Sequence, residues 1–283
     1  MSNIVYGSEL AQERREQLKQ QIELLKSQNK RIPCLAVILC GDNPASLSYV
    51  KGKEKACAAI GMENIFIPLP ATVSQKELEN TIKKCNEDTS IDGILVQLPL
   101  PNGLDENKAI LAIDPEKDVD GLHPMNVGRL YLNEPGFIPC TPLGVMALLE
   151  KMGCSISGKK TVVLGRSKLV GSPVARLLQN QNATVTICHS KTKDLPQVCK
   201  EADILIVAIG KPNYVTSDYV KEGAYVIDVG IHRKDDGHLT GDVDFESVAP
   251  HTSAITPVPK GVGPMTICML LENTMLSYQR REQ

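Results

Sequence analysis

The stretch KTVVLGRSKLVGSPVARLL, residues 160–178, decides the fold of this chain. It joins a short apolar strand to a helix through a turn that contains glycine. In a doubly wound α/β domain, a turn in this place holds the pyrophosphate of a dinucleotide. Gly165 permits the tight turn and Gly171 allows another backbone to approach closely. The pattern is G-R-S-x-x-x-G-x-P and not G-x-G-x-x-G, so the residues alone leave a plain tight turn as the alternative.

Strand and helix patterns alternate on both sides of this stretch. The strand patterns are continuous Val/Ile/Leu runs, which are typical of parallel strands covered on both faces, so we predict an α/β fold. The predicted strands occupy residues 33–41, 64–69, 92–101, 160–165, 183–190, 203–210, 224–230 and 253–257. The predicted helices lie within residues 8–28, 43–61, 74–87, 141–153, 172–181, 195–202 and 263–279.

Capping residues mark the limits of two of these helices. Asn43 is the expected N-cap of one helix, with Pro44 at its first position and Gly61 at its end. Ser74 and Glu77 have the spacing of a capping box at the start of the next helix.

The chain has 283 residues, enough for two domains. A proline-rich passage, NEPGFIPCTP, separates the two series of strands and helices. We therefore predict one domain over residues 1–140 and a second over 141–263. The pattern leaves open whether the last helix, at about 264–283, packs back on the first domain.

Composition excludes several classes of partner and location. The formal net charge is −2, so no basic excess supports binding to nucleic acid or to an anionic membrane. The 9 cysteines form no C-x-x-C pair and lie mostly in apolar runs, which indicates reduced thiols in a cytoplasmic protein. No apolar run approaches the ~20 residues needed to cross a bilayer, and the N-terminus lacks an apolar signal core.

The end of the second strand after residue 160 bears on cofactor choice. A site selective for NAD usually places Asp or Glu there, to bind the ribose 2'-hydroxyl. This chain has His189, Ser190 and Lys191 instead, with Arg166 in the nearby turn. These side chains can donate to a 2'-phosphate, so we predict NADP in preference to NAD. The alternative is a polar strand end facing water.

Tyr49 and Lys53 lie four residues apart on the helix predicted at 43–61, and therefore share one face. Lys51 and Lys55 point elsewhere and are expected in water. A buried lysine has a lowered pKa and can exchange protons near neutral pH. The competing interpretation is that all three lysines are solvated. Short-chain dehydrogenases also use a Tyr-x-x-x-Lys pair, but there the glycine turn precedes the pair, whereas here it follows.

Two further segments carry candidate site residues. Gln97 ends the strand of DGILVQLPLP, where it can hold Lys53, hold a substrate amide or face water. The loop within PEKDVDGLHPMNVGRL gathers Asp118, Asp120 and His123 without clear periodicity. These residues could ligate a metal, but no fourth ligand is placed by spacing. A carboxylate that holds a nitrogen heterocycle fits equally well.

Seven motifs together carry a resemblance to a known family. They are SYVKGKEKACAAIGM, DGILVQLPLP, KDVDGLHPMNVGRL, PCTPLGV, VVLGRSKLVGSPVARLL, ICHSKT and VGPMT, over roughly residues 44–266. In this order they resemble the bifunctional methylenetetrahydrofolate dehydrogenase/methenyltetrahydrofolate cyclohydrolase family. The resemblance implies an N-terminal folate-binding catalytic domain, a C-terminal Rossmann-like NADP domain, a cleft between them and a homodimer. It also implies a multifunctional oxidoreductase and hydrolase of one-carbon metabolism, which serves purine biosynthesis.

The resemblance implies two reactions and a set of site residues. NADP takes a hydride from 5,10-methylenetetrahydrofolate, and water then opens the methenyl product to 10-formyltetrahydrofolate. No metal is implied. The residues implied as catalytic or substrate-binding are Lys53, Tyr49, Gln97, Asp120, Leu98 and Pro264. Those implied at the cofactor are Gly165, Arg166, Ser167, Ser190, Ile231, Gly263 and Thr266.

The chain departs from the family pattern at one position. Where the family often reads P-G-G-V-G-P, this chain reads PKGVGP, with Lys260 in place of the first glycine. If the position needs a positive φ, Lys260 strains it; otherwise it adds a positive charge to the loop. Two rival functions remain on the residues alone: an NADP-binding sensor without turnover, and a dehydrogenase of a small acid or amino acid without a hydrolytic step.

Overall fold

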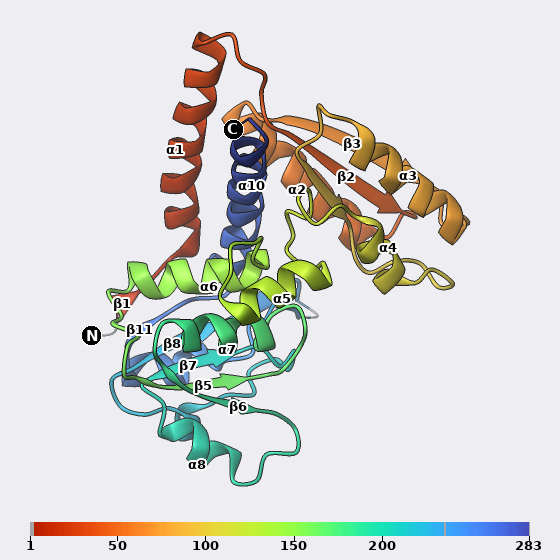
Figure 1. Ribbon diagram of the computed structural model, residues 1–283. Helices are drawn as coiled ribbons and strands as arrows, with labels where there is room; N and C mark the ends of the chain where they lie inside the picture. Colours follow the sequence, from red (N-terminus) through yellow and green to blue (C-terminus); the bar gives the residue numbers. More distant parts are fainter. Residues whose placement is uncertain (1–2, 235, 283) are drawn as a thin grey trace. The chain divides into compact units, whose positions relative to one another are not determined.

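The computed structural model describes residues 3–234 and 236–282 (Figure 1). The chain divides into two compact units. The six-stranded unit comprises the residues up to Gln12 together with Thr141–Thr266, and the three-stranded unit comprises Glu13–Cys140 together with the residues from Ile267 onward.

The six-stranded unit contains a parallel sheet, a short hairpin and the helices that cover them. Its elements are β1 (Asn3–Ile4), α6 (Cys140–Lys151), β5 (Lys160–Leu164), α7 (Gly171–Asn180), β6 (Thr184–Cys188), α8 (Leu195–Lys200), β7 (Ile204–Val207), η1 (Ser217–Tyr219), β8 (Ala224–Asp228), β9 (His232–Arg233), β10 (Leu239–Thr240), α9 (Phe245–Val248), η2 (Ala249–His251) and β11 (Thr252–Ile255).

The three-stranded unit has the same alternation of strands and helices. Its elements are β2 (Cys34–Cys40), α2 (Pro44–Ile60), β3 (Glu63–Leu69), α3 (Gln75–Glu87), β4 (Gly93–Val96), α4 (Glu106–Ala112) and α5 (Pro124–Leu132). Two longer helices, α1 (Gly7–Ser27) and α10 (Val262–Arg281), contribute residues to both units.

The order of the parallel strands creates a switch point at β5. The sheet runs β1-β11-β8-β7-β5-β6, and Leu164 at the end of β5 pairs with Cys188 of β6 on one side and Val207 of β7 on the other. The connection after β5 leads to β6 on one side, and the connection after β7 leads to β8 on the other. Ligands of open α/β sheets bind at such a point.

In the three-stranded unit, β2 is the central strand between β3 and β4, and all of its residues are buried. Alternate residues of β2, including Ala36 and Ile38, pack with Leu78 and Ile82 of α3 in one apolar cluster. Their neighbours along the strand point to the opposite face. Burial on both faces is the reason why the strand reads as an unbroken apolar run.

The predicted helix caps are confirmed. The Asn43 side chain accepts hydrogen bonds from the backbone N–H groups at the start of α2, and Gly61 ends that helix with φ 76°. Ser74 and Glu77 form the expected capping box of α3. All 9 cysteines are buried, and none of them forms a disulfide.

The grouping differs from the boundaries expected from the sequence at the N-terminus. Residues 1–140 were expected to form one domain, but β1 pairs in parallel with β11, Asn3 with Ala254, and so belongs with the six-stranded sheet. Two residues cannot form a sheet alone, and the exposed edge of β11 completes their hydrogen bonds.

The segment expected to be a loop at residues 115–130 contains helix α5. The C-terminal part of α10 is tied to the three-stranded unit: Ser277 Oγ donates to the carbonyls of Asp92 and Glu116, and Arg281 pairs with the Asp92 carboxylate at 3.0 Å. Within the described residues, no helix has both the length and the apolarity needed to cross a membrane.

Candidate active site

Lys53 is the buried lysine of helix α2. Only 9% of its surface is exposed, whereas Lys51 and Lys55 lie in water, as the spacing predicts. The helix turns 100° at each residue, so positions two apart face away from each other. The interpretation in which all three lysines are solvated is therefore wrong for Lys53.

Gln97 holds the ammonium group of Lys53. The Nζ of Lys53 donates to Gln97 Oε1 at 2.8 Å. Gln97 is itself fixed, because its backbone N–H donates to Ile38 of β2 and its Nε2 donates to the Leu98 carbonyl. Of the three roles predicted for Gln97, the structure shows the contact with Lys53. The two residues are 44 positions apart in the sequence, and strand register and helix packing bring them together.

Tyr49 is an exposed residue of α2 and does not hold Lys53. Its side chain is 51% exposed, and within the described residues no hydrogen bond joins the two side chains. Lys53 belongs instead to the buried residues of α2, with Val50 and Cys57, and its hydrogen-bond partner is the amide of Gln97. The Tyr49 side chain is thus accessible to a ligand.

The electrostatics of Lys53 and Asp120 are coupled. Burial lowers the pKa of Lys53, and the negative charge of Asp120 partly opposes this. Burial raises the pKa of Asp120, and Lys53 and the thiol of Cys140 oppose that shift. The Asp120 residue keeps part of its surface accessible although protein atoms surround its carboxyl group. Burial therefore shifts the pKa values of the amine and the acid toward each other.

Asp118 and His123, next to Asp120, serve the loop backbone. The Asp118 carboxylate accepts hydrogen bonds from the N–H of Leu122 and His123 and from the amide of Asn126. The His123 Nδ1 accepts from the N–H of Met125 and caps α5. Nowhere in the described part of the chain are three or more His, Cys, Asp or Glu residues grouped as a metal would need. Asp120 is the member of this cluster whose charge acts on the pKa of Lys53.

Cys140 and Asn273 support the Asp120 loop, and sequence reasoning missed both. The Cys140 thiol donates to the Val119 carbonyl at 3.4 Å, and Asn273 Nδ2 donates to the same carbonyl at 2.8 Å and to that of Ile138 at 3.1 Å. Burial raises the pKa of Cys140 well above the ordinary thiol value. No local pattern marks either residue, because their contacts span 21 and 154 positions.

The glycine turn after β5 is built as a close-contact site. Gly165 has φ 124°, and a β-carbon on it would collide with the Ala208 carbonyl oxygen. A β-carbon on Gly171 would collide with the carbonyl oxygen of Gly165. The Ser167 hydroxyl accepts hydrogen bonds from the N–H groups of Val170 and Gly171 at the start of α7. Only glycine fits the two positions, and the turn leaves Arg166 exposed.

The strand end after β6 carries no carboxylate. Ser190 is exposed there, while the His189 ring accepts a hydrogen bond from the backbone N–H of Lys191 through Nδ1. His189 is therefore partly engaged in shaping the turn. Ser190 and Lys191 are exposed beyond the end of β6, and Arg166 is exposed beyond the end of β5.

The loop before α10 resolves the question raised by Lys260. Its φ is 78°, which is the left-handed region, so the first of the two alternatives holds and the side chain strains the backbone. The Lys260 carbonyl accepts a hydrogen bond from the Ser8 N–H at 3.0 Å, which fixes this geometry. Gly263 is exposed and Pro264 partly buried. Thr266 shares a hydroxyl hydrogen bond of 2.9 Å with Thr141.

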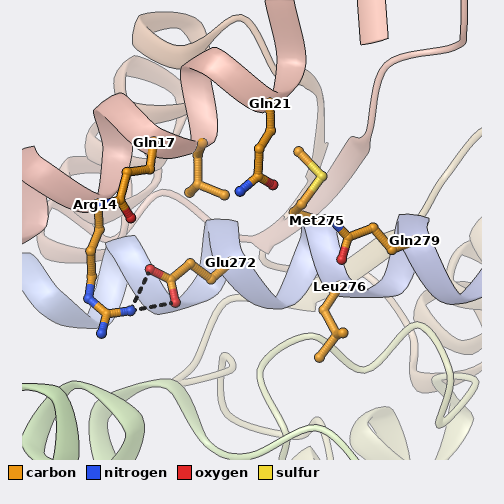
Figure 2. A pocket seen from close by; sticks show the side chains of 8 residues that line it. Arg14, Gln17, Gln21, Glu272, Met275, Leu276 and Gln279 are labelled. Carbon is orange, nitrogen blue, oxygen red and sulfur yellow. Dashed lines mark hydrogen bonds and ion pairs between the residues drawn. The ribbon is translucent and has the colours of Figure 1, made fainter. Parts of the chain in front are cut away.

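Figure 2 shows a pocket within the three-stranded unit, between α1 and α10. Its lining residues are Arg14, Gln17, Leu18, Gln21, Glu272, Met275, Leu276 and Gln279. Arg14 points at Glu272, and the two form an ion pair at 3.1 Å. The pocket contains none of the residues predicted at the substrate or the cofactor.

These features define a class of protein. A glycine turn at the switch point of a parallel sheet fits a dinucleotide, and a desolvated lysine held by an amide is suited to proton transfer. Together they indicate a two-unit α/β oxidoreductase.

Comparison with known proteins identifies the family. The chain belongs to the tetrahydrofolate dehydrogenase/cyclohydrolase family: residues 5–120 match its catalytic domain and residues 139–282 its NAD(P)-binding domain. It is 55% identical over 275 residues to the bifunctional protein FolD of Oceanobacillus iheyensis, covering 97% of this chain and 96% of that one. It is 54% identical to FolD of Anoxybacillus flavithermus, covering 100% and 99%. The resemblance found in the sequence is thus confirmed.

Solved structures agree. The crystal structure of the bifunctional enzyme FolD from Campylobacter jejuni matches with a TM-score of 0.97 at 49% identity, over 99% of this chain and 100% of that one. The Trypanosoma brucei enzyme, complexed with NADP cofactor and inhibitor, matches with a TM-score of 0.95 at 41% identity, over 100% and 99%. A shikimate dehydrogenase from Thermus thermophilus, at 15% identity and a TM-score of 0.53, shares the fold alone.

Proposed function

We propose that this chain oxidises 5,10-methylenetetrahydrofolate with NADP and hydrolyses the resulting 5,10-methenyltetrahydrofolate to 10-formyltetrahydrofolate. Family membership supports both activities. The observation that carries the proposal is the buried Lys53 amine, bonded to Gln97 and electrostatically coupled to Asp120. A cofactor-binding sensor has no use for this arrangement.

In the second reaction, the hydrolysis, Lys53 accepts a proton from water. Water adds to the cationic methenyl carbon and gives up a proton to the neutral amine of Lys53. The bond from that carbon to N5 then breaks: the hydroxyl on the carbon gives up its remaining proton and becomes the formyl oxygen, N5 takes up one proton, and the carbon remains on N10 as the formyl group. One proton is released overall. Gln97 orients the amine by accepting from Nζ, and the lowered pKa of Lys53 favours its neutral form.

The carboxylate of Asp120 has a separate role in this proposal. It holds the pterin ring and stabilises the positive charge of the methenyl intermediate, because a preformed negative charge in a desolvated site acts strongly on a developing cation. The exposed Tyr49 ring lies against the substrate, together with Leu98.

The residues at the glycine turn fit NADP, which supplies the hydride acceptor of the first reaction. The closely packed Gly165 and Gly171 shape the turn. The other residues that the family resemblance implies at the cofactor are Ser167, Ile231, Gly263 and Thr266. Ser190 and Arg166 donate to the 2'-phosphate, since both are exposed and no carboxylate stands at the end of β6 to repel it.

We also propose that the enzyme works in the cytoplasm as a homodimer, with tetrahydrofolate derivatives as its ligands and without nucleic acid or membrane as a partner. The buried thiols support the cytoplasmic location, and the net charge of −2 argues against nucleic acid or an anionic membrane as a partner. The homodimer and the folate ligands rest on family membership. Sedimentation of the purified chain would test the dimer.

One assay tests the function. Purified protein is incubated with methylenetetrahydrofolate and either NADP or NAD, and both the methenyl and the formyl products are followed. We expect both products, with NADP preferred. Binding of NADP without turnover would favour the sensor, and formation of the methenyl product without accelerated hydrolysis would leave a dehydrogenase alone.

A further inference from the structure

A buried carboxylate organises the loop that follows β7. Asp242 is fully buried, and its Oδ2 accepts hydrogen bonds from the N–H groups of Ile209 at 2.7 Å and Gly210 at 2.9 Å. Its Oδ1 accepts from the N–H of Lys211 at 2.8 Å and from Nε2 of His232 at 2.8 Å. The carboxylate thus holds three consecutive backbone groups and one imidazole. We call Asp242, His232 and the N–H groups of 209–211 the Asp242 clasp.

A second buried carboxylate supports the first from behind. Asp228, at the end of β8, accepts from the N–H groups of Gly230, Asp242 and Val243 at 2.9–3.0 Å. A β-carbon on Gly230 would collide with the Asp242 carboxyl group, and one on Gly241 would collide with that of Asp228. The two glycines therefore let both carboxylates pack directly on backbone.

The clasp lies at the carboxyl ends of β7 and β8. Ala208 is the first residue after β7, and residues 209–211 come next. The Ala208 carbonyl packs against Gly165 of the glycine turn. Ile231 is 50% exposed and lies between Gly230, which donates to Asp228, and His232, which donates to Asp242. Asp228 and Asp242 therefore hold the residues on both sides of Ile231, and Asp242 also holds residues 209–211, which follow Ala208.

Strand order indicates which half of a dinucleotide meets the clasp. β6 lies on one side of β5, and β7 and β8 lie on the other. The adenosine ribose of a dinucleotide contacts the strand in the position of β6, and its pyrophosphate lies at the turn after β5. The remaining half of the molecule, the nicotinamide riboside, then extends over the ends of β7 and β8.

We propose that the Asp242 clasp is a positioning device for the nicotinamide half of the cofactor, and that Asp242 and His232 determine the binding of that half without determining hydrolysis. This rests on the proposed function, since it presumes that NADP binds at the turn. The alternative is a role in folding alone, which would affect every ligand of the six-stranded unit equally.

Substitution of Asp242 by asparagine tests the clasp with minimal change of shape. The new NH₂ group must face either the N–H groups of Ile209 and Gly210 or the N–H of Lys211, so at least one donor faces another donor in every orientation. We expect NADP to bind about 10-fold more weakly, as for the loss of a hydrogen bond to a charged group. Binding of adenosine 2',5'-bisphosphate, which lacks the nicotinamide half, should change less than about 2-fold.

His232 offers a second test, because its side chain is partly accessible and tolerates change more readily. His232→Leu removes the donor to Asp242 and should weaken NADP about 3- to 10-fold, whereas His232→Gln keeps an amide donor and should restore most of the binding. The control pair is His238 and Asp236 in the same hairpin, an exposed ion pair at 3.3 Å. His238→Leu and Asp236→Asn should leave NADP binding unchanged.

The readouts separate the two proposals. NADP and adenosine 2',5'-bisphosphate are titrated by calorimetry, and hydrolysis of supplied methenyltetrahydrofolate is measured without cofactor. Selective loss of NADP affinity with hydrolysis intact supports the clasp. Unchanged NADP affinity in both Asp242→Asn and His232→Leu overturns it, as does equal loss of both ligands. Failure of the wild-type protein to bind NADP would instead refute the proposed function.

Discussion

The substitution Lys53→Met should stop the second reaction while sparing the first. Methionine matches the length of the lysine stem and fills the same buried space, but it cannot accept a proton. A positioned acid–base group is worth about 10²–10⁴ in rate, so hydrolysis of methenyltetrahydrofolate should fall by that factor. Oxidation of methylenetetrahydrofolate transfers a hydride and no proton to Lys53, so the methenyl compound should accumulate.

The structure indicates that this variant folds. Loss of the 2.8 Å hydrogen bond leaves Gln97 Oε1 without its donor, which costs about 1–3 kcal/mol. Removal of an amine whose pKa is lowered by burial offsets part of that cost. A net loss of about 1 kcal/mol would lower the Tm by about 2–4 °C in a protein of this size.

Lys51→Met and Lys55→Met are the matched controls, since they remove the same charge from exposed positions of the same helix. The assay follows the absorbance of methenyltetrahydrofolate, corrected for spontaneous hydrolysis, in all three variants. Wild-type hydrolysis by Lys53→Met, or loss of hydrolysis in Lys51→Met alone, would refute the assignment of the proton-transferring lysine.

Four other expectations follow from the same groups. Because the neutral amine of Lys53 accepts the proton, the rate of hydrolysis should decline as the pH falls through the lowered pKa of Lys53. The Lys53→Met variant should lack this decline at acid pH. A decline that persists in the variant would contradict the assignment. Asp120→Ala should damage both reactions while NADP affinity stays within about 2-fold, and normal turnover, or loss of wild-type activity to a chelator, would exclude the role given to it. Ser190→Asp should weaken NADP by about 10-fold or more through repulsion of the 2'-phosphate, so unchanged affinity in a titration would remove Ser190 from the site. Lys260→Gly should raise the free energy of unfolding by about 0.5–1 kcal/mol, because relief of left-handed strain of about 1–2 kcal/mol exceeds the added entropy of the unfolded glycine; denaturant unfolding measures this, and destabilisation would contradict the strain.

The amino-acid sequence alone determined the features that depend on neighbours along the chain. The glycine turn between β5 and α7 and the caps at Asn43 and Ser74 follow from helical period, strand length and the backbone freedom of glycine. The helical period also separated Lys53 from Lys51 and Lys55, but only the structure showed that Lys53 is buried. The absence of a carboxylate after β6 could also be predicted from the sequence. Once the end of a strand is located, the residues that follow it are known.

Only the tertiary structure decided which distant groups meet. Gln97 was a strand-end residue with three possible roles until the register of β2 and β4 brought it against Lys53. Asn273 reaches the Asp120 loop from 154 positions away, and Asp242 reaches the loop after β7 across about 30. Such partners are chosen by how strands pair and helices pack. The periodicity of a segment fixes the face a side chain occupies, but it carries no information about what another segment places opposite that face.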